Sequence, residues 1–77
     1  MNQFRLEAVD IDPILDAAVR RAQSDFKEMP GLRLTLPQAA RLWAFDMLFC
    51  RDVLATLVQT QFLVRSRDTF IRAEGRT

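Results

Sequence analysis

The 77-residue sequence contains no histidine, a single cysteine, two glycines and three prolines. One cysteine cannot form a disulfide within the chain, and without histidine the chain cannot assemble the usual zinc-binding sets. The scarcity of glycine also excludes a glycine-rich loop that cradles phosphates. We therefore expect no metal, no cofactor and no disulfide scaffold.

Long hydrophobic runs are absent as well. No apolar segment approaches the roughly 18–20 residues that a helix needs to cross a bilayer. The N-terminal segment lacks the apolar stretch of a secretory signal peptide. No nucleophile, base and oxyanion hole can be assembled from the side chains present. We expect a cytoplasmic protein of bacterial type that contacts no membrane and is not an enzyme.

The composition, with 49% hydrophobic and 27% charged residues, is that of a globular chain, and its length allows one domain at most. The net charge of +1 is no polybasic signal, but the charges are unevenly distributed. Residues 1–30 hold four basic and six acidic side chains, whereas residues 31–77 hold seven basic and four acidic ones. The second half can therefore contact phosphates, the alternative being an ordinary solvated surface.

The first half of the sequence predicts one helix. Residues 1–11 alternate weakly between apolar and polar and indicate an N-terminal arm or a short strand. Asp12 can accept from the first free amides and Pro13 suits the first helical position, so a helix begins there. It is expected to end at Glu28, before the helix breaker at residues 29–31. Its predicted apolar face consists of Ile14, Leu15, Ala18, Val19, Ala22 and Phe26.

Two helices are predicted in the middle of the chain. Thr35 is a suitable N-cap for a helix over residues 36–43, and Gln38, three residues later, completes a capping box. Asp46 is a suitable N-cap for a second helix over residues 47–60. The first helix is expected to bury Ala39, Ala40, Leu42 and Trp43. The buried face of the second is expected to contain Met47, Cys50, Val53, Leu54, Leu57, Val58 and Gln61.

The remaining segments have a β-like pattern. Residues 32–35 form a short β-like run, and residues 62–65 and 70–72 predict two strands joined by a polar turn. So short a hairpin must pack on the helices to be stable. Residues 73–77 are expected to form a flexible tail. The expected fold is one small α+β domain, mostly α, with three helices and a C-terminal β-hairpin.

Residues 34–72 resemble the winged helix-turn-helix of bacterial transcriptional regulators of the IclR and MarR type. The matching stretches are Leu34–Leu36, Gln38–Leu42, Leu54–Val58 and Phe62–Arg65. The resemblance implies a leading helix, a two-helix motif whose second helix lies in the major groove, and a hairpin wing. It therefore implies a transcriptional regulator or accessory factor that binds double-stranded DNA. A homodimer through the N-terminal arm and the first helix is a further expectation, since so short a chain is marginally stable alone.

On this resemblance, the first residues of the second motif helix meet base edges. By position these are Met47, Leu48, Phe49, Arg51 and Asp52. Only Arg51 is a strong base reader among them. Arg65 and Arg67 flank the wing tip, where they contact the backbone or minor groove or merely keep the hairpin soluble. Arg33 and Arg41 are further candidates for phosphate contacts, although Arg41 can instead pair with a nearby acid.

The apolar start of the second motif helix suggests an alternative function. Met47 is expected on the buried face, whereas Leu48 and Phe49 cannot both lie there. One of these two is expected to fill the crossing of the helices and the other to be exposed. An exposed apolar cluster on so small a domain suggests a protein–protein contact, with Met47, Leu48 and Phe49 as the partner-binding residues. Cys50 and Trp43 are expected to be core residues rather than ligands.

Overall fold

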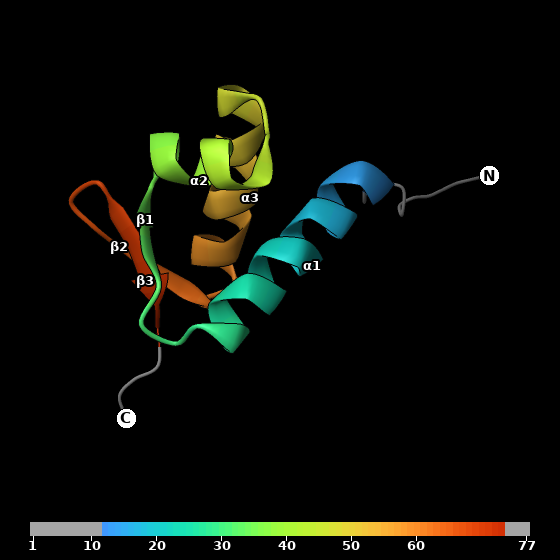
Figure 1. Ribbon diagram of the computed structural model, residues 1–77. Coiled ribbons are helices and arrows are strands. Elements are labelled where there is room, and N and C mark those ends of the chain that lie inside the picture. The colour runs from blue at the N-terminus through green and yellow to red at the C-terminus, as the bar shows by residue number, and fades with distance from the viewer. Residues whose placement is uncertain (1–11, 74–77) are drawn as a thin grey trace.

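The computed structural model describes residues 12–73, in which three helices and a three-stranded antiparallel sheet form a mostly helical α+β unit (Figure 1). The expected arm over residues 1–11 and most of the expected tail, residues 74–77, lie outside the described residues. Ala73 donates a backbone hydrogen bond of 3.0 Å to the carbonyl of Phe62. The elements are α1 (Pro13–Glu28), β1 (Arg33–Thr35), α2 (Leu36–Trp43), α3 (Met47–Gln59), β2 (Leu63–Ser66) and β3 (Thr69–Arg72).

Each helix begins at the N-cap that the sequence predicts. Asp12 and Asp46 each accept a hydrogen bond of 3.0 Å from the amide two residues further on. Thr35 and Gln38 form a complete capping box, with bonds of 3.3 and 2.9 Å between side chain and backbone. These contacts satisfy amides that have no partner within the helix, so the starts of the helices follow from local chemistry.

α2 and α3 both end in a left-handed residue that is not glycine. These residues are Ala44, with φ of 58°, and Gln61, with φ of 68°. In each case the following amide donates to the carbonyl five residues back at 2.9 Å, which is the hydrogen bond of a Schellman motif. Because α3 ends at Gln59, the prediction that Gln61 lies on its buried face is wrong, and this residue is exposed.

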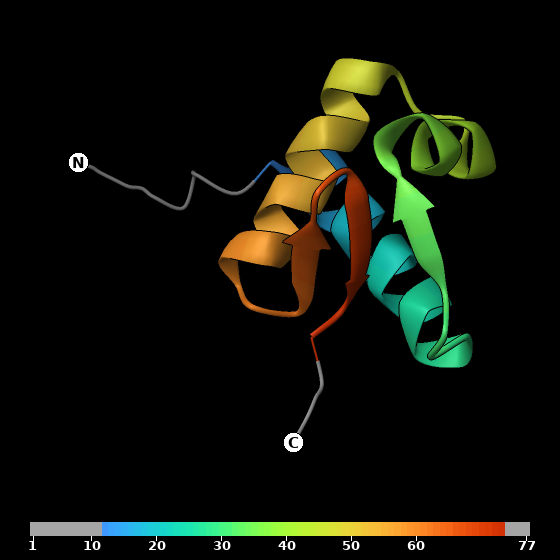
Figure 2. The same cartoon turned by 90° about the vertical axis from the view of Figure 1, so that its left-hand side faces the viewer.

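The sheet has the strand order β1-β3-β2, and Figure 2 shows α3 alongside its β2 edge. β3 pairs Phe70 with Leu34 on one side and with Arg65 on the other, so these three side chains share one face. Arg33 and Ile71, paired one position along, lie on the opposite face. The sequence predicts the β2–β3 hairpin and the β-like run separately, and the structure joins them into one sheet.

The core lies between the three helices and the inner face of the sheet. Phe26 and Trp43 meet edge to face with ring centroids 6.2 Å apart. The indole Nε1 of Trp43 donates to Oδ2 of Asp25 at 2.7 Å, which satisfies the one polar atom of a buried side chain. The buried set comprises Ala18, Ala22, Phe26, Leu34, Ala39, Ala40, Trp43, Cys50, Val53, Leu54, Leu57 and Leu63. The predicted core positions of Trp43 and Cys50 are therefore confirmed.

Three side chains that the sequence predicts to be buried are exposed: Ile14 at 70%, Leu42 at 48% and Met47 at 45%. Ile14 and Met47 stand in the first turns of α1 and α3, and α1 begins beyond the end of the other helices in Figure 1. Leu42 borders the buried face of α2, which is formed by Ala39, Ala40 and Trp43, and about half of its surface is left exposed. Helical periodicity predicts which residues share a face of a helix. It does not show how much of that face a neighbouring element covers, and for this reason the sequence pattern predicts the three residues to be buried.

Candidate nucleic-acid interface

Two hollows adjoin where α3 meets the β2–β3 hairpin. Both are lined by Arg51 of α3 and by Arg65 and Phe70 of the hairpin. The first extends to Thr35, Leu36, Pro37 and Asp68, and the second runs along α3 to Ala55, Val58 and Gln59. We call their combined surface the α3–hairpin groove. It joins residues from three parts of the sequence and brings together two of the predicted DNA-contacting arginines.

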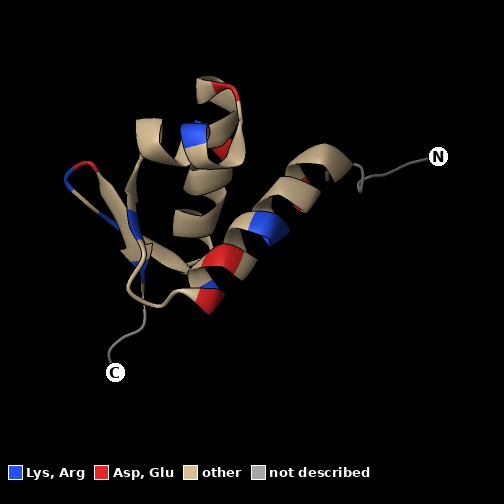
Figure 3. Cartoon of the chain, in the orientation of Figure 1, with Lys and Arg blue, Asp and Glu red and all other residues tan. Residues whose placement is uncertain are grey.

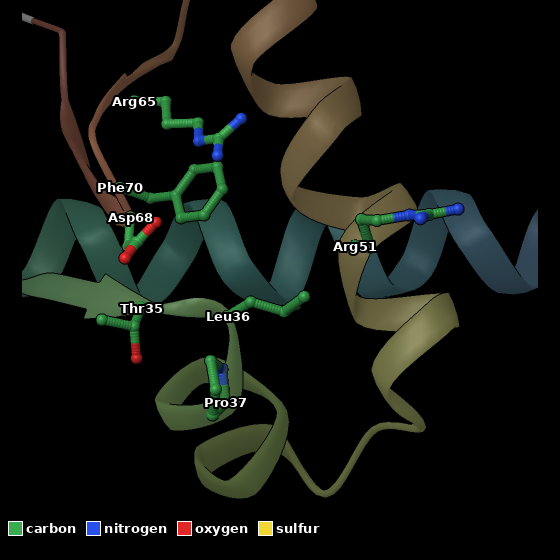
Figure 4. Close-up of a pocket in the computed structure, with 7 residues that line it drawn as sticks. All are labelled: Thr35, Leu36, Pro37, Arg51, Arg65, Asp68 and Phe70. Atoms are coloured by element: carbon green, nitrogen blue, oxygen red, sulfur yellow. The ribbon is translucent and has the colours of Figure 1, made fainter.

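The hairpin register directs Arg65 and Phe70 into this groove. The two residues are direct partners across β2 and β3, and Phe70 shares its face with buried Leu34. The Nε of Arg65 donates to the carbonyl oxygen of Arg67 at 2.8 Å, which ties the Arg65 side chain to the turn. In Figure 4, Arg65 and Phe70 lie side by side on the hairpin, whereas Arg51 extends from α3 away from both.

α3 presents to solvent an exposed stripe with helical spacing, which we call the outer stripe. It consists of Leu48, Asp52, Ala55 and Gln59. Leu48 is 63% exposed, the largest exposure of any large apolar side chain in α2 or α3. Arg51 lies beside this stripe on the side of the groove. The outer stripe is thus accessible along most of the helix and mixes apolar with polar side chains.

The N-terminus of α3 is closed by its own cap. Oδ2 of Asp46 accepts from the amides of Leu48 and Phe49 at 3.0 and 3.3 Å. Free amides at a helix N-terminus can bind a phosphate, but here a carboxylate occupies that place. An anion that approaches α3 must therefore be held by side chains, and Arg51 is the basic residue of that helix.

The other predicted arginines lie apart from the groove. Arg41 is exposed on α2 and lines neither hollow. Among the ion pairs of residues 12–73, which include Arg20 with Asp16 at 3.1 Å, none involves Arg41, so the alternative pairing is not found there. Arg33 lies on the face of the sheet opposite Arg65 and lines a separate hollow, to which Arg72 also contributes. Figure 3 shows that both signs of charge are interspersed over the elements.

The apolar start of α3 is divided between core and surface. Phe49 is half-buried, and its ring stands nearly perpendicular to that of Phe45 with centroids 5.1 Å apart. Phe49 therefore fills the crossing of the helices and Leu48 is the exposed member of the pair. The sequence predicts one residue of each kind but not which is which. Leu42, Met47 and Leu48 are all exposed and stand on either side of the α2–α3 turn in the chain, and we call these three residues the apolar patch.

The single cysteine of the chain, Cys50, lies in the core. Cys50 is fully buried, and desolvation raises the pKa of its thiol to about 11, so the nucleophilic thiolate is suppressed at neutral pH. Within residues 12–73 no group of three or more His, Cys, Asp or Glu side chains is placed to hold a metal ion. Over the same range, no helix has the length and apolar character needed to cross a membrane.

Sequence reasoning missed Phe70 and the start of α2 as parts of the groove. It selected Arg51 and Arg65 for different reasons, and nothing in the sequence places them at the same hollow. The available signal for Phe70 was the alternation of side chains along the two hairpin strands. Once the register of the hairpin is known, Phe70 is the partner of Arg65 and lies on the same face. No protein-family model, curated protein or solved structure matches the chain.

Proposed function

We propose that this chain is a DNA-binding winged-helix module that acts as a transcriptional regulator or accessory factor. The carrying observation is that Arg51 and Arg65, from α3 and from the hairpin, flank one groove. Both are exposed, and neither belongs to an ion pair among residues 12–73. Exposed cations attract a polyanion, and concave surroundings strengthen that attraction, although Asp68 in the same hollow offsets part of it.

The order of the elements supports the same proposal. A leading helix, a strand, two short helices and a hairpin follow one another, and β1 pairs antiparallel with β3. In the proposal α2 and α3 form the two-helix motif, and the β2–β3 hairpin is the wing. α3 then enters the major groove with its outer stripe toward the bases, and the hairpin lies on the adjoining backbone.

The directions of the two groove arginines favour an extended anion over a small one. Arg51 points away from Arg65, so the two guanidinium groups do not converge on one site (Figure 4). Successive phosphates of a nucleic-acid backbone suit such a divergent pair. Arg67 in the hairpin turn and Arg41 on α2 are further phosphate contacts in this proposal. Arg33, on the opposite sheet face, contributes only general attraction.

Fluorescence anisotropy with a mixed-sequence duplex, titrated at low and near-physiological salt, tests the proposal. We expect binding at roughly micromolar concentration that falls steeply with salt. Replacing Arg51 and Arg65 together by Ala should weaken binding and reduce the slope of log affinity against log salt by about 1.8, the value for two phosphate contacts. Arg33→Ala is the matched control and should keep most of the affinity. Absence of binding at low salt by the folded wild type would overturn the proposal.

A second candidate function is protein–protein interaction through the apolar patch of Leu42, Met47 and Leu48. It is favoured by the exposure of all three side chains around one turn. Sedimentation should then show self-association, or binding to a partner, that Leu48→Asp abolishes without unfolding the protein. The homodimer predicted through residues 1–11 and α1 is a separate proposal, and the exposed Ile14 of α1 supports it. Ile14→Asp should abolish that dimer and leave DNA binding per protomer intact.

A further inference from the structure

We propose that the outer stripe of α3 selects thymine, with Leu48 and Ala55 against the 5-methyl groups of thymines in the major groove. This inference rests on the proposed DNA binding and names the bases that the site prefers. Its starting point is that the side of α3 facing away from the core begins with a leucine that is 63% exposed. A leucine at that position cannot recognise a hydrogen-bond pattern.

The structure gives Leu48 no packing role. The buried side of α3 is formed by Cys50, Leu54 and their neighbours, and the crossing with α2 is filled by Phe49. An exposed leucine gains free energy when an apolar group covers it. Among the groups that base edges present in the major groove, the thymine methyl is the apolar one. Leu48 therefore matches thymine better than any other base.

Asp52 and Ala55 continue the same preference along the stripe. Ala55 stands two helical turns beyond Leu48, so it presents a second small apolar surface on the same side. Asp52 lies between them, where its carboxylate repels phosphates and can accept only from a base amino group. The stripe thus avoids the backbone and faces base edges, while Arg51 beside it reaches guanine or a phosphate.

Deoxyuridine provides a direct test, because it differs from thymidine only in lacking the 5-methyl group. The probes are an A·T-rich duplex and the same duplex with every thymidine replaced by deoxyuridine, compared by anisotropy at low salt. Wild type should bind the thymine duplex about fourfold more tightly for each methyl group that is covered. Leu48→Ala should lower the ratio of the two affinities, and Leu48→Ala combined with Ala55→Gly should bring it close to one. Leu42→Ala removes an exposed leucine from α2 and should leave the ratio unchanged.

The outcomes separate this inference from the function on which it rests. Salt-sensitive binding of equal strength to both duplexes overturns thymine selection and leaves DNA binding in place. A thymine preference that is undiminished in Leu48→Ala overturns the assignment to that residue, provided that circular dichroism shows the variant is folded. If the wild type binds neither duplex, DNA binding fails and thymine selection with it. The exposure of Leu48 is then explained by a protein contact.

Discussion

α3 has a buried side and an exposed side that differ in composition and in the constraints on them. Cys50, Val53, Leu54 and Leu57 are completely buried, and this side carries no charged group. The outer stripe alternates apolar with polar side chains and is exposed along its length, and its members Ala55 and Gln59 also line the α3–hairpin groove. Dense packing constrains the size and shape of every side chain on the buried side. The residue types of the outer stripe are free of that constraint and can suit whatever the stripe binds. The outer stripe is therefore the part of α3 in which function can be sought.

α1 shows the same contrast between a buried and an exposed side, here with two aspartates, Asp25 and Asp16. Asp25 is half-buried and accepts the indole N–H of Trp43, which joins α1 to α2. Asp16 forms an exposed ion pair with Arg20, one turn along the same helix. The first contact satisfies a donor that water cannot reach, and the second is screened by solvent. Equal substitutions on the two sides of a helix should therefore have unequal effects.

The largest effect is expected from Leu54→Ala on the buried side of α3. Leu54 has no exposed surface, so its truncation should lower the free energy of unfolding by about 2–5 kcal/mol through lost burial and a cavity. Leu48→Ala, the same change on the outer stripe, should shift it by no more than about 0.5 kcal/mol. Urea denaturation followed by circular dichroism measures both. Similar losses for the two variants would show that Leu48 is packed.

An intermediate effect is expected from Asp25→Ala. The Nε1 of Trp43, a side chain 1% exposed, would lose its acceptor, which should cost about 1–3 kcal/mol of unfolding free energy. Asp16→Ala breaks the exposed pair with Arg20 and should cost only about 0.5 kcal/mol. The same urea titrations apply. Equal costs would argue against the bond between the indole and Asp25 as the link between α1 and α2.

The smallest effect concerns Cys50 and alkaline pH. Burial raises the pKa of its thiol from about 9 to about 11, so between these values the unfolded chain loses the proton while the folded protein keeps it. Stability should therefore be constant below pH 9 and decline as the pH rises toward 11, by roughly 1 kcal/mol at pH 10. The chain has no tyrosine and a single lysine, so few other side chains titrate in this range.

Urea midpoints measured from pH 8 to pH 11 would show this decline. Cys50→Ala should be less stable at neutral pH, because it leaves a small cavity, but its midpoint should stay flat where that of the wild type falls. An equal decline in the variant would assign the alkaline loss to another group.

Local signals in the sequence predict the helices well. The caps at Asp12, Thr35 and Asp46 use side chains that satisfy amides two or three residues away, so no distant contact is needed to predict them. The same locality explains the correct end of α1 at Glu28. It also explains why one of Leu48 and Phe49 is exposed, since two adjacent helical residues cannot face the same way, but it does not tell which one.

The sequence predicts burial wrongly at positions where the neighbouring helix or strand does not cover the whole apolar face. Ile14, Leu42 and Met47 are apolar and near the predicted faces, but no neighbouring element reaches them. The pairing of β1 with β3 joins segments more than thirty residues apart, and no local pattern gives its register. That register in turn decides that Arg65 faces α3 while Arg33 lies on the other side of the sheet.

By itself the sequence determined where the helices begin, and it placed the end of α3 and the strands of the hairpin to within one residue, because caps, breakers and side-chain alternation act within a few residues. Only the tertiary structure decided which apolar side chains are buried and which arginines share a surface. Arg51 and Arg65 meet at one groove because α3 packs beside the hairpin, and Leu48 is exposed because Phe49 takes the helix crossing. Both results depend on contacts between elements, whose free energy comes from burying surfaces that are distant in the chain.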